Sequence, residues 1–526
     1  MPGTSPPLIH LMGGLIGCSL DAITASMPPA LRTLLTRTDF RVCSVLNSQE
    51  LIVRAKTRVR DSSCKYCSPI GTFTAAVSQE LDEHPRFRGS VPTQMTARKN
   101  PPTKNVEDGK GKSLLGRTLG VLGPGLITGA ADDDPSGIST YSVAGAAYGY
   151  ATLWIALLTF PLMTAVQLMC ARLGVVTGRG LAAAVRIYYP RWVLWGACSI
   201  LAVANVINIG ADLGGMAEAT QLVTGIRSLI WILFYAFFIT GLLIWISYKL
   251  IARIFRWLTL VLFAYVFTSF FAHVDWRHAL AVTFVPHLEW SRGFLAVLVA
   301  ILGTTISPYL FFWQAAEEVE EGRSKGRTLA KHKGTTAGEL RRVRADTVAG
   351  MFFSNGIMYF IILTTAATLH AHGETDVTTA RQAAEALRPL AGNGAYLLFT
   401  LGLIGTGMLG VPVLVGSCAY AVAEGASWRG SMAEKPRSAR KFYAVMVVAM
   451  AMGLGLNYLG FSAVKMLFWS AIINGLLAPP LILLVILLTS SHKVMGERVN
   501  SPLLRYLGWA TFAVMTAAAV GMLITS

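Results

Sequence analysis

The stretch Ala130-Ala131-Asp132-Asp133-Asp134-Pro135-Ser136-Gly137 decides how this chain folds. It interrupts a run of apolar and small residues that covers positions 119–147. Even one charged side chain at the centre of a bilayer costs at least about 2.5–3.5 kcal/mol, so three consecutive carboxylates need water, a cation or polar partners. Proline disfavours helical geometry in the residue before it, and glycine tolerates almost any backbone angle. The sequence therefore predicts a membrane-spanning helix that breaks here, with its carboxylates and freed carbonyls facing a cavity.

The composition is typical of a polytopic membrane protein. Of the 526 residues, 53% are hydrophobic and 14% are charged, whereas a soluble globular chain carries about 25% charged residues. The net charge of +17 would also suit a nucleic-acid-binding protein. In a membrane protein, however, basic residues usually gather in cytoplasmic loops. We therefore expect the lipid bilayer as a partner, and no nucleic acid.

Residues 1–113 differ from the rest of the chain. They are rich in Lys and Arg and show no persistent hydrophobic period. The apolar run at 8–20 is too short to span a bilayer and lacks a basic leader, so we do not expect a signal peptide. Two interpretations stay open for this segment. It is either a basic, disordered cytoplasmic extension or a mis-assigned start, with Met95 as the alternative first residue.

Residues 114–526 are predicted to form a domain of eleven membrane-spanning helices. The apolar spans lie near 116–147, 150–176, 191–223, 228–248, 251–273, 292–317, 346–370, 394–423, 440–459, 461–489 and 503–524. Each is near or above the ~20 residues needed to cross a bilayer. Lys and Arg concentrate in alternate loops, for example eight of them at 323–344. The positive-inside rule then places the N-terminus in the cytoplasm and the C-terminus outside, and we expect the plasma (inner) membrane.

The sixth span carries a second interruption, Gly303-Thr304-Thr305-Ile306-Ser307-Pro308-Tyr309, and Pro308 follows Pro135 by 173 residues. Each break falls in the first span of a five-helix set, spans 1–5 and spans 6–10. Interrupted helices at matching positions of two halves are typical of inverted-repeat transporters. We therefore predict an all-α polytopic membrane protein with a 5+5 inverted repeat, an eleventh helix, and breaks in helices 1 and 6.

Asp134 is the strongest candidate for a metal ligand. A cation would offset the burial of its carboxylate, and Mg²⁺, Mn²⁺ and Fe²⁺ all accept carboxylate oxygen. Unwinding would also free the carbonyls of Ala131 and Thr304. Ser307 could offer a hydroxyl and Tyr309 a phenol, although either could equally make an ordinary hydrogen bond between helices.

Three polar residues of the third span, Asn205, Asn208 and Asp212, follow each other at steps of three and four, which places them on one helical face. An intramembrane aspartate is a functional candidate by default. We therefore assign Asp212, with Asn208 and Asp133, to a proton path or a cavity. The acidic run at 317–321 is interpreted as a solvated helix end, with attraction of cations to an inner vestibule as the alternative.

Two motifs resemble those of a known family. Gly123-Pro124-Gly125 followed by Asp134-Pro135-Ser136-Gly137 resembles the first helix of the natural-resistance-associated macrophage protein (Nramp) divalent-metal transporters, whose motif is Asp-Pro-Gly-Asn. The segment 303–309 resembles their sixth helix, where Met-Pro-His is usual. The resemblance covers about residues 116–524. It implies a LeuT-like inverted-repeat fold and metal uptake that is often coupled to protons.

The resemblance also assigns individual residues. It implies that Asp134 is the metal aspartate, that Ala131 and Thr304 hold the carbonyl positions, and that Asp212 is the third-helix aspartate of the proton path.

The chain departs from the family pattern at four positions. Gly137 replaces the asparagine ligand, Ser307 the methionine and Tyr309 the histidine, while Gly215 stands where a third-helix glutamate is usual. Sulfur ligands select transition metals over Mg²⁺ and Ca²⁺, so loss of the thioether favours harder cations. Loss of the histidine and the glutamate weakens the expectation of proton coupling. In lacking the asparagine and the methionine, the chain is similar to the family's magnesium-transporting relatives.

We expect a secondary transporter for divalent cations of the Mn/Fe/Mg class, which it would carry as substrate and not hold as a cofactor. One alternative is a symporter of the same fold for an amino acid or another small solute. Such a symporter exposes half-helix N-termini to a substrate carboxylate, which three aspartates would repel. The other alternative is a metal-sensing membrane protein, which would need a folded soluble domain. No Ser/His/Asp or His-x-x-x-His pattern falls inside the spans, so we do not expect an enzyme. The oligomeric state is left open.

Overall fold

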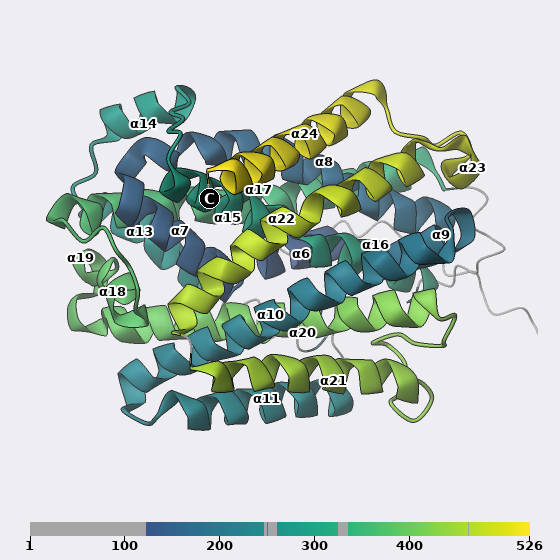
Figure 1. Ribbon diagram of the computed structural model, residues 1–526, viewed down its shortest axis with the longest axis horizontal. Coiled ribbons are helices and arrows are strands. Elements are labelled where there is room, and N and C mark those ends of the chain that lie inside the picture. The colour runs from purple at the N-terminus through teal and green to yellow at the C-terminus, as the bar shows by residue number, and fades with distance from the viewer. Residues whose placement is uncertain (1–122, 247–249, 251–259, 325–334, 461, 526) are drawn as a thin grey trace, which may run out of the picture. The chain divides into compact units, whose positions relative to one another are not determined.

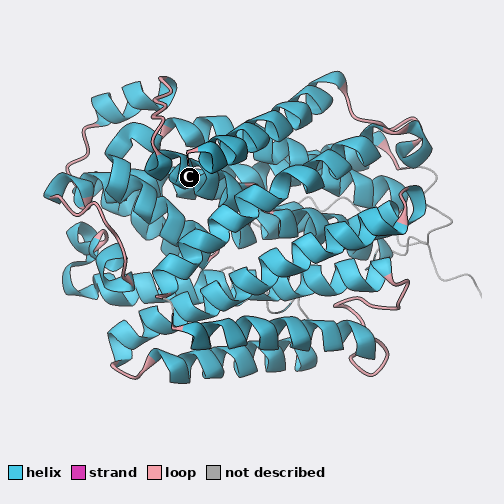
Figure 2. Ribbon diagram, viewed as in Figure 1, coloured by secondary structure: helices cyan, strands magenta, loops and turns pink. Residues whose placement is uncertain are grey.

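The computed structural model describes residues 123–246, 250, 260–324, 335–460 and 462–525. These residues form a bundle of helices, and they contain no strand (Figures 1 and 2). The basic segment 1–113, the alternative start at Met95 and the beginning of the first predicted span lie outside the described residues.

The first span is broken where the sequence predicts it. Helix α6 (Pro124–Asp132) ends at the aspartate run, and α7 (Pro135–Tyr148) begins directly after it. Only Asp133 and Asp134 lie between the two helices. Asp134 is extended, with φ −73° and ψ 173°, as the steric demand of a following proline requires. Gly137 is already helical, so the proline causes the break and the glycine is not needed for it.

The sixth span is broken in the same way. Helix α15 (Arg292–Thr305) and α16 (Pro308–Ser324) are separated by Ile306 and Ser307. The two broken spans lie against each other, with α6 in contact with α16 and α7 in contact with α15. The first half of one span thus meets the second half of the other. This arrangement results when two antiparallel helices lie side by side and break at the same depth.

The other spans follow the predicted order. They are α8 (Trp154–Thr177), α10 (Arg191–Thr224), α11 (Ser228–Trp245), η3 (Leu260–Leu262) with α13 (Phe263–Phe271), α17 (Ala337–Thr368), α20 (Ala395–Gly425), α21 (Arg440–Leu456), α22 (Ala463–Ser490) and α24 (Pro502–Ile524). Within the described ranges, nine helical stretches are long and apolar enough to cross a membrane. The pair α6–α7 and the segment 260–271 stand at the first and fifth predicted spans, so the predicted fold class is confirmed.

Two helices extend beyond the apolar spans predicted for them. The sixth span was expected to end at 317 and the seventh to begin at 346, but α16 continues to Ser324 and α17 already begins at Ala337. Thr336 and Glu339 form a capping box that starts α17. Apolar residues mark the part of a helix that crosses a bilayer, whereas the helix itself continues through polar residues.

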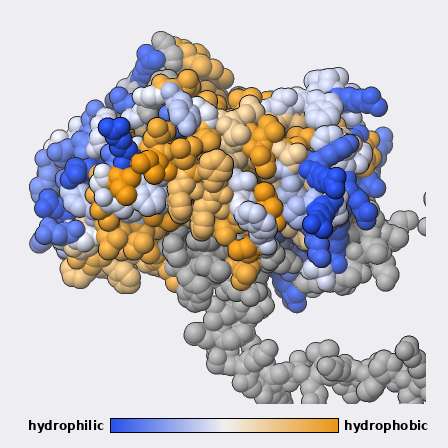
Figure 3. Space-filling view, turned by 90° about the horizontal axis from the view of Figure 1, so that it is seen from below, coloured by the Kyte–Doolittle hydropathy of each residue, from blue (hydrophilic) through white to orange (hydrophobic). Residues whose placement is uncertain are grey.

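Short helices cover the two ends of the bundle (Figure 1). Helices α9 (Leu181–Tyr188) and α23 (His492–Met495) lie at one end, while α14 (Trp276–Phe284), α18 (Ala380–Glu385) and α19 (Arg388–Ala391) lie at the other. The space-filling view shows hydrophobic side chains over the middle of the molecule and hydrophilic ones towards both ends (Figure 3). This distribution is that of an integral membrane protein.

The broken helices are the most enclosed part of the bundle. In the most apolar window of α15–α16, 94% of the residues are buried, against 28% in α11 and 33% in α24. Helices α11, α21 and α24 are peripheral and expose large apolar side chains, such as Phe237 and Trp245. The two breaks therefore lie at the centre of the protein, away from lipid.

Candidate metal site

Asp134 caps the N-terminus of α7. Its Oδ1 atom accepts hydrogen bonds from the backbone N–H of Gly137 at 2.9 Å and from the Ser136 hydroxyl at 2.6 Å. The N-terminus of a helix has unpaired N–H groups and a partial positive charge, and both stabilise a carboxylate. The side chain is only 1% exposed. The local sequence thus holds a buried negative charge at the break.

The second carboxylate oxygen of Asp134 meets the hydroxyl of Tyr309, which in turn meets a backbone carbonyl. The Tyr309 hydroxyl lies 3.1 Å from Asp134 Oδ2 and 3.1 Å from the carbonyl oxygen of Ala131. Ala131 is in the last turn of α6, where carbonyls lack an intrahelical partner. Two ligands at right angles and 3.1 Å apart correspond to metal–oxygen distances of about 2.2 Å, between those usual for Mg²⁺ and for Ca²⁺. The spacing suits a divalent cation.

Thr304 and Ser307 lie beside this cluster. The Ser307 hydroxyl donates to the carbonyls of its own helix, at 2.6 Å to Thr304 and 3.1 Å to Gly303. The Thr304 carbonyl, which was predicted to be free, is therefore already bonded. The Thr304 hydroxyl lies 3.4 Å from the hydroxyl of Ser136, which itself bonds to Asp134. The hydroxyl groups of Thr304 and Ser136 thus connect the break in the sixth span to the Asp134 carboxylate.

Gly137 supports the carboxylate of Asp134 through its backbone. Its N–H donates to Asp134, and a Cβ added at this position would lie 3.3 Å from both Thr304 Oγ1 and Tyr141 Cε2. At Gly137, where the family has an asparagine, neighbouring side chains therefore pack close to the backbone.

The other two aspartates of the run face a different helix. The Ser354 hydroxyl of α17 lies 2.6 Å from Asp132 Oδ2 and 3.2 Å from Asp133 Oδ1. Both aspartates are buried, and in the described part of the protein their remaining oxygens have no hydrogen-bond partner. The assignment of Asp133, with Asp212, to a proton path or cavity stays a prediction, and the structure places Asp133 beside Asp132 at Ser354.

The polar face of α10 is buried as predicted. Asn205 donates to the Leu414 carbonyl and the Ser417 hydroxyl of α20, both at 2.8 Å. The amide of Asn208 and both carboxylate oxygens of Asp212 have no hydrogen-bond partner among the described residues. Unpaired buried polar atoms are costly, so these side chains are candidates for contact with water, a proton or a cation.

Gly410 of α20 brings Asp212 close to Asp134, and sequence reasoning missed it. A Cβ added at Gly410 would lie 3.1 Å from Asp134 Cβ and 3.9 Å from Asp212 Oδ2. The absence of a side chain at Gly410 therefore leaves the space beside which the side chains of both aspartates lie. A single glycine within an apolar span carries no sequence signal for this contact.

The acidic run of α16 is buried, so its interpretation as a solvated helix end was wrong. Glu317, Glu318 and Glu320 are only 3–7% exposed. Glu320 accepts hydrogen bonds from the Tyr420 hydroxyl and, at 3.2 Å, from the backbone N–H of Met432. The run is covered because α20 and the segment after it fold over the end of α16.

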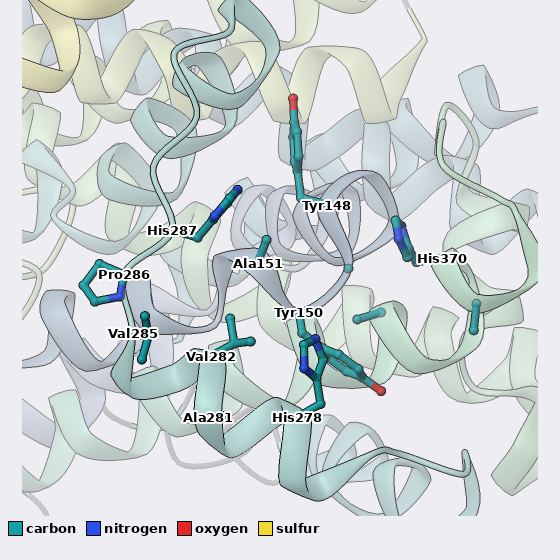
Figure 4. A pocket seen from close by; sticks show the side chains of 13 residues that line it. Tyr148, Tyr150, Ala151, His278, Ala281, Val282, Val285, Pro286, His287 and His370 are labelled. Carbon is teal, nitrogen blue, oxygen red and sulfur yellow. The ribbon is translucent and has the colours of Figure 1, made fainter.

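A separate cavity lies at the other end of α7 (Figure 4). It has a volume of about 660 Å³, and its lining includes Tyr148, Tyr150, His278, His287 and His370. The three histidines come from three separate segments. In the described part of the chain, no group of three or more His, Cys, Asp or Glu side chains could hold a metal ion. A cation site in this part would therefore combine a carboxylate with carbonyl and hydroxyl oxygens, as hard cations accept.

A membrane bundle in which two broken helices meet at a buried carboxylate defines a transporter of the LeuT-like, inverted-repeat class. Solved structures share this fold. A manganese transporter from Eremococcus coleocola has a TM-score of 0.62 and 19% identity, over 80% of this chain and 89% of that one. Mhp1, a nucleobase-cation-symport-1 family transporter, has a TM-score of 0.50 and 14% identity, over 77% and 90%. At these identities the likeness shows the fold alone.

The sequence places the chain within this class. Residues 125–525 match the family model described as natural resistance-associated macrophage protein-like, and the chain belongs to this family. Curated relatives include a divalent metal cation transporter MntH from Klebsiella pneumoniae, 26% identical over 79% of this chain and 96% of the relative. Another MntH, from Deinococcus radiodurans, is 27% identical over 80% and 95%. The resemblance predicted from the two motifs is thereby confirmed.

Proposed function

We propose that this protein is a secondary transporter that moves divalent metal cations across the membrane by alternating access. The observation that carries the proposal is the cluster of Asp134, Ala131 and Tyr309 at the meeting point of two broken helices. Its three oxygen atoms come from three separate segments, and the 3.1 Å distances from the Tyr309 hydroxyl to the other two suit a divalent ion. The names of the relatives, a manganese transporter and two divalent metal cation transporters, point in the same direction.

The charge of the site favours a cationic substrate. Asp134 and Asp212 are both buried and approach each other at Gly410. Two ionised carboxylates on either side of one glycine in a low-dielectric interior would repel each other, and a divalent cation would offset that repulsion. We assign a coupled proton, where there is one, to Asp212. At Gly215, the family's glutamate position, an added Cβ would lie 2.8 Å from Leu467 Cδ1, so an apolar side chain takes the place of the second acid.

The same geometry disfavours an amino-acid symporter. In that mechanism the N-terminus of a half-helix binds the carboxylate of the substrate. Here the N-terminus of α7 already binds the carboxylate of Asp134 through Gly137 and Ser136. A substrate carboxylate would have to displace a side chain of the protein and would also meet its negative charge.

The orientation and the domain organisation belong to the proposal too. We place the protein in the plasma (inner) membrane, with the N-terminus in the cytoplasm and the C-terminus outside, because the basic loops alternate along the sequence. Residues 114–526 form the transporter domain, and residues 1–113 precede it as an extension.

Uptake of Mn²⁺ and Mg²⁺ into proteoliposomes tests the proposal. Wild-type protein should show saturable uptake, and Asp134→Asn should reduce it at least about 100-fold, since loss of even an outer-shell partner costs 10- to 100-fold. Asparagine is as good a helix cap as aspartate, so the variant should still fold. Asp376→Asn, at an exposed loop position, is the control. Wild-type uptake by Asp134→Asn, or stimulation by amino acids and not by metals, would refute the proposal.

A further inference from the structure

The N-terminal end of α6 is held by a residue of another helix. The N-cap residue is Gly123, which has no side chain to cap the helix, and Pro124 has no N–H. Instead, the backbone N–H of Gly123 donates to Asp346 Oδ1 at 3.1 Å, and that of Gly125 donates to Asp346 Oδ2 at 2.6 Å. Asp346 belongs to α17. Both oxygens of one carboxylate therefore bind the start of a helix more than 200 residues away in sequence.

Helix α6 is a short segment that packs on α17 and ends at the break. It has nine residues, and the break at Asp133 and Asp134 separates it from α7. Its first turn lies flat on α17, because a Cβ added at Gly125 would lie 2.6 Å from the backbone nitrogen of Thr347. Its last turn supplies the Ala131 carbonyl to the candidate metal site. A displacement of α6 would thus remove one oxygen from that site.

We propose that Asp346 is a latch that holds α6 on α17 and thereby keeps the metal site closed at the α16 C-terminal end of the bundle. Asp346 lies near the start of α17, the helix that follows the C-terminal end of α16 in the chain, which places the latch at that end. Asp346 touches no substrate and positions Ala131 through α6. The latch rests on the proposed function insofar as alternating access requires α6 to be released. Charge-assisted hydrogen bonds to a helix N-terminus are stronger than neutral ones, so a carboxylate suits this position.

Thiol labelling of purified protein tests the latch. Thr128 lies in the middle of α6 and is fully buried, so Thr128→Cys reports on the release of α6 once the seven natural cysteines have been replaced. We expect slow reaction with N-ethylmaleimide in the parent protein. Asp346→Ala should accelerate the reaction at least about ten-fold, the factor that corresponds to one lost charge-assisted hydrogen bond.

The matched control is Asp275→Ala. Asp275 also caps a helix, α14, but it does so within its own segment by accepting from the N–H of His278 at 3.1 Å. Its loss should leave the labelling of Thr128→Cys unchanged. A second variant alters the latch from the other side. A Cβ at Gly123 would lie 2.8 Å from Asp346 Cγ, so Gly123→Ala should displace the carboxylate and accelerate labelling as well, whereas Asp346→Glu should restore part of the protection.

The outcomes separate this inference from the proposed function, because labelling requires no metal. Faster labelling in both Asp346→Ala and Gly123→Ala supports the latch, even if the wild-type protein transports no Mn²⁺. Parent-like labelling in both variants, each eluting as a single folded species, overturns it. An equal acceleration by Asp275→Ala also overturns it, because the effect would then be one of general stability. With uptake established, the KM for Mn²⁺ supplied from the side opposite the latch should rise in inverse proportion to the fraction of the protein that still faces that side.

Discussion

Tyr309 has one hydroxyl proton and two acceptors. Its oxygen lies equally far from Ala131 O and Asp134 Oδ2, yet it can donate to only one of them at a time. A cation between the three oxygens would use lone pairs on all of them. The phenol therefore has more value as an oxygen ligand than as a donor, and the histidine usual at this position in the family would offer nitrogen instead.

Replacement of Tyr309 by phenylalanine tests this assignment. We expect the KM for Mn²⁺ and for Mg²⁺ to rise about ten-fold, because one neutral ligand is lost while the charge of Asp134 remains. Tyr141→Phe is the matched control. Tyr141 is equally buried, and its hydroxyl lies 3.3 Å from Thr305 Oγ1. Uptake kinetics in proteoliposomes give both values, and an equal effect of the two substitutions would exclude a ligand function for Tyr309.

We predict that Ser307 influences which cations the site prefers. Ser307→Met would release the Thr304 carbonyl, which its hydroxyl now occupies at 2.6 Å, and would add a thioether. Sulfur favours Cd²⁺ and Mn²⁺ over Mg²⁺. We expect wild-type protein to accept Mg²⁺ and Mn²⁺ with no large advantage for Cd²⁺. The variant should shift towards Cd²⁺ by about 1–2 kcal/mol, roughly ten-fold or somewhat more.

Competition of each cation against Mn²⁺ uptake in both proteins measures this shift. A wild-type site that already prefers Cd²⁺ strongly over Mg²⁺, or an unchanged order in Ser307→Met, would show that Ser307 does not affect the ion. The hard-site argument would then be wrong.

The residues of the candidate site differ in how well they could be predicted from the sequence. Asp134 was predictable because a charge inside an apolar span is costly, and Tyr309 because it follows a proline at the matching break. Ser354 was not predictable, although it bonds to Asp132 across more than 200 residues. A serine is common in membrane helices, and only the packing of α17 against α6 gives it this partner.

Among the elements, the two breaks were easier to predict than the helix ends. A proline after a buried polar residue fixes a break within a residue or two. The ends of α16 and α17 depend on a capping box and on cover by other segments, neither of which changes hydropathy. Hydropathy also fails to reveal the contribution of α20, which depends on one small residue, Gly410, where this helix passes the broken helices.

Gly410→Ala tests that close approach. An added methyl group would lie 3.1 Å from Asp134 Cβ, a distance that requires the carboxylate to shift. Because the site lies in a tightly packed core, we expect Mn²⁺ uptake to fall about ten-fold or more with normal insertion into the membrane. The control is Gly402→Ala on the same helix, where the added Cβ would make an ordinary contact of 3.7 Å with Leu262 Cδ2. Equal uptake by the two variants would show that the space at Gly410 is not required.

At the scale of the whole molecule, the two-fold repetition explains why the site is central. Each half contributes one broken helix as its first span, so the two breaks meet where the halves pack together. The number of spans and the pairing of the breaks could be read from hydropathy and proline positions. Which side faces the cytoplasm rests on the alternation of basic loops alone, and the segment before the first span has no counterpart in that repetition.

Deletion of residues 1–94 tests how much of the chain transport requires. The deletion leaves Met95 as the first residue and removes no predicted span and neither motif. The family match begins only at residue 125. If the transporter domain begins near 114, uptake of Mn²⁺ per inserted molecule should equal that of the full chain, with the same KM. The measurement compares both proteins in proteoliposomes at matched, quantified protein content. A lost or constitutively altered activity would instead assign a regulatory function to the basic segment and would favour the interpretation of the protein as a sensor.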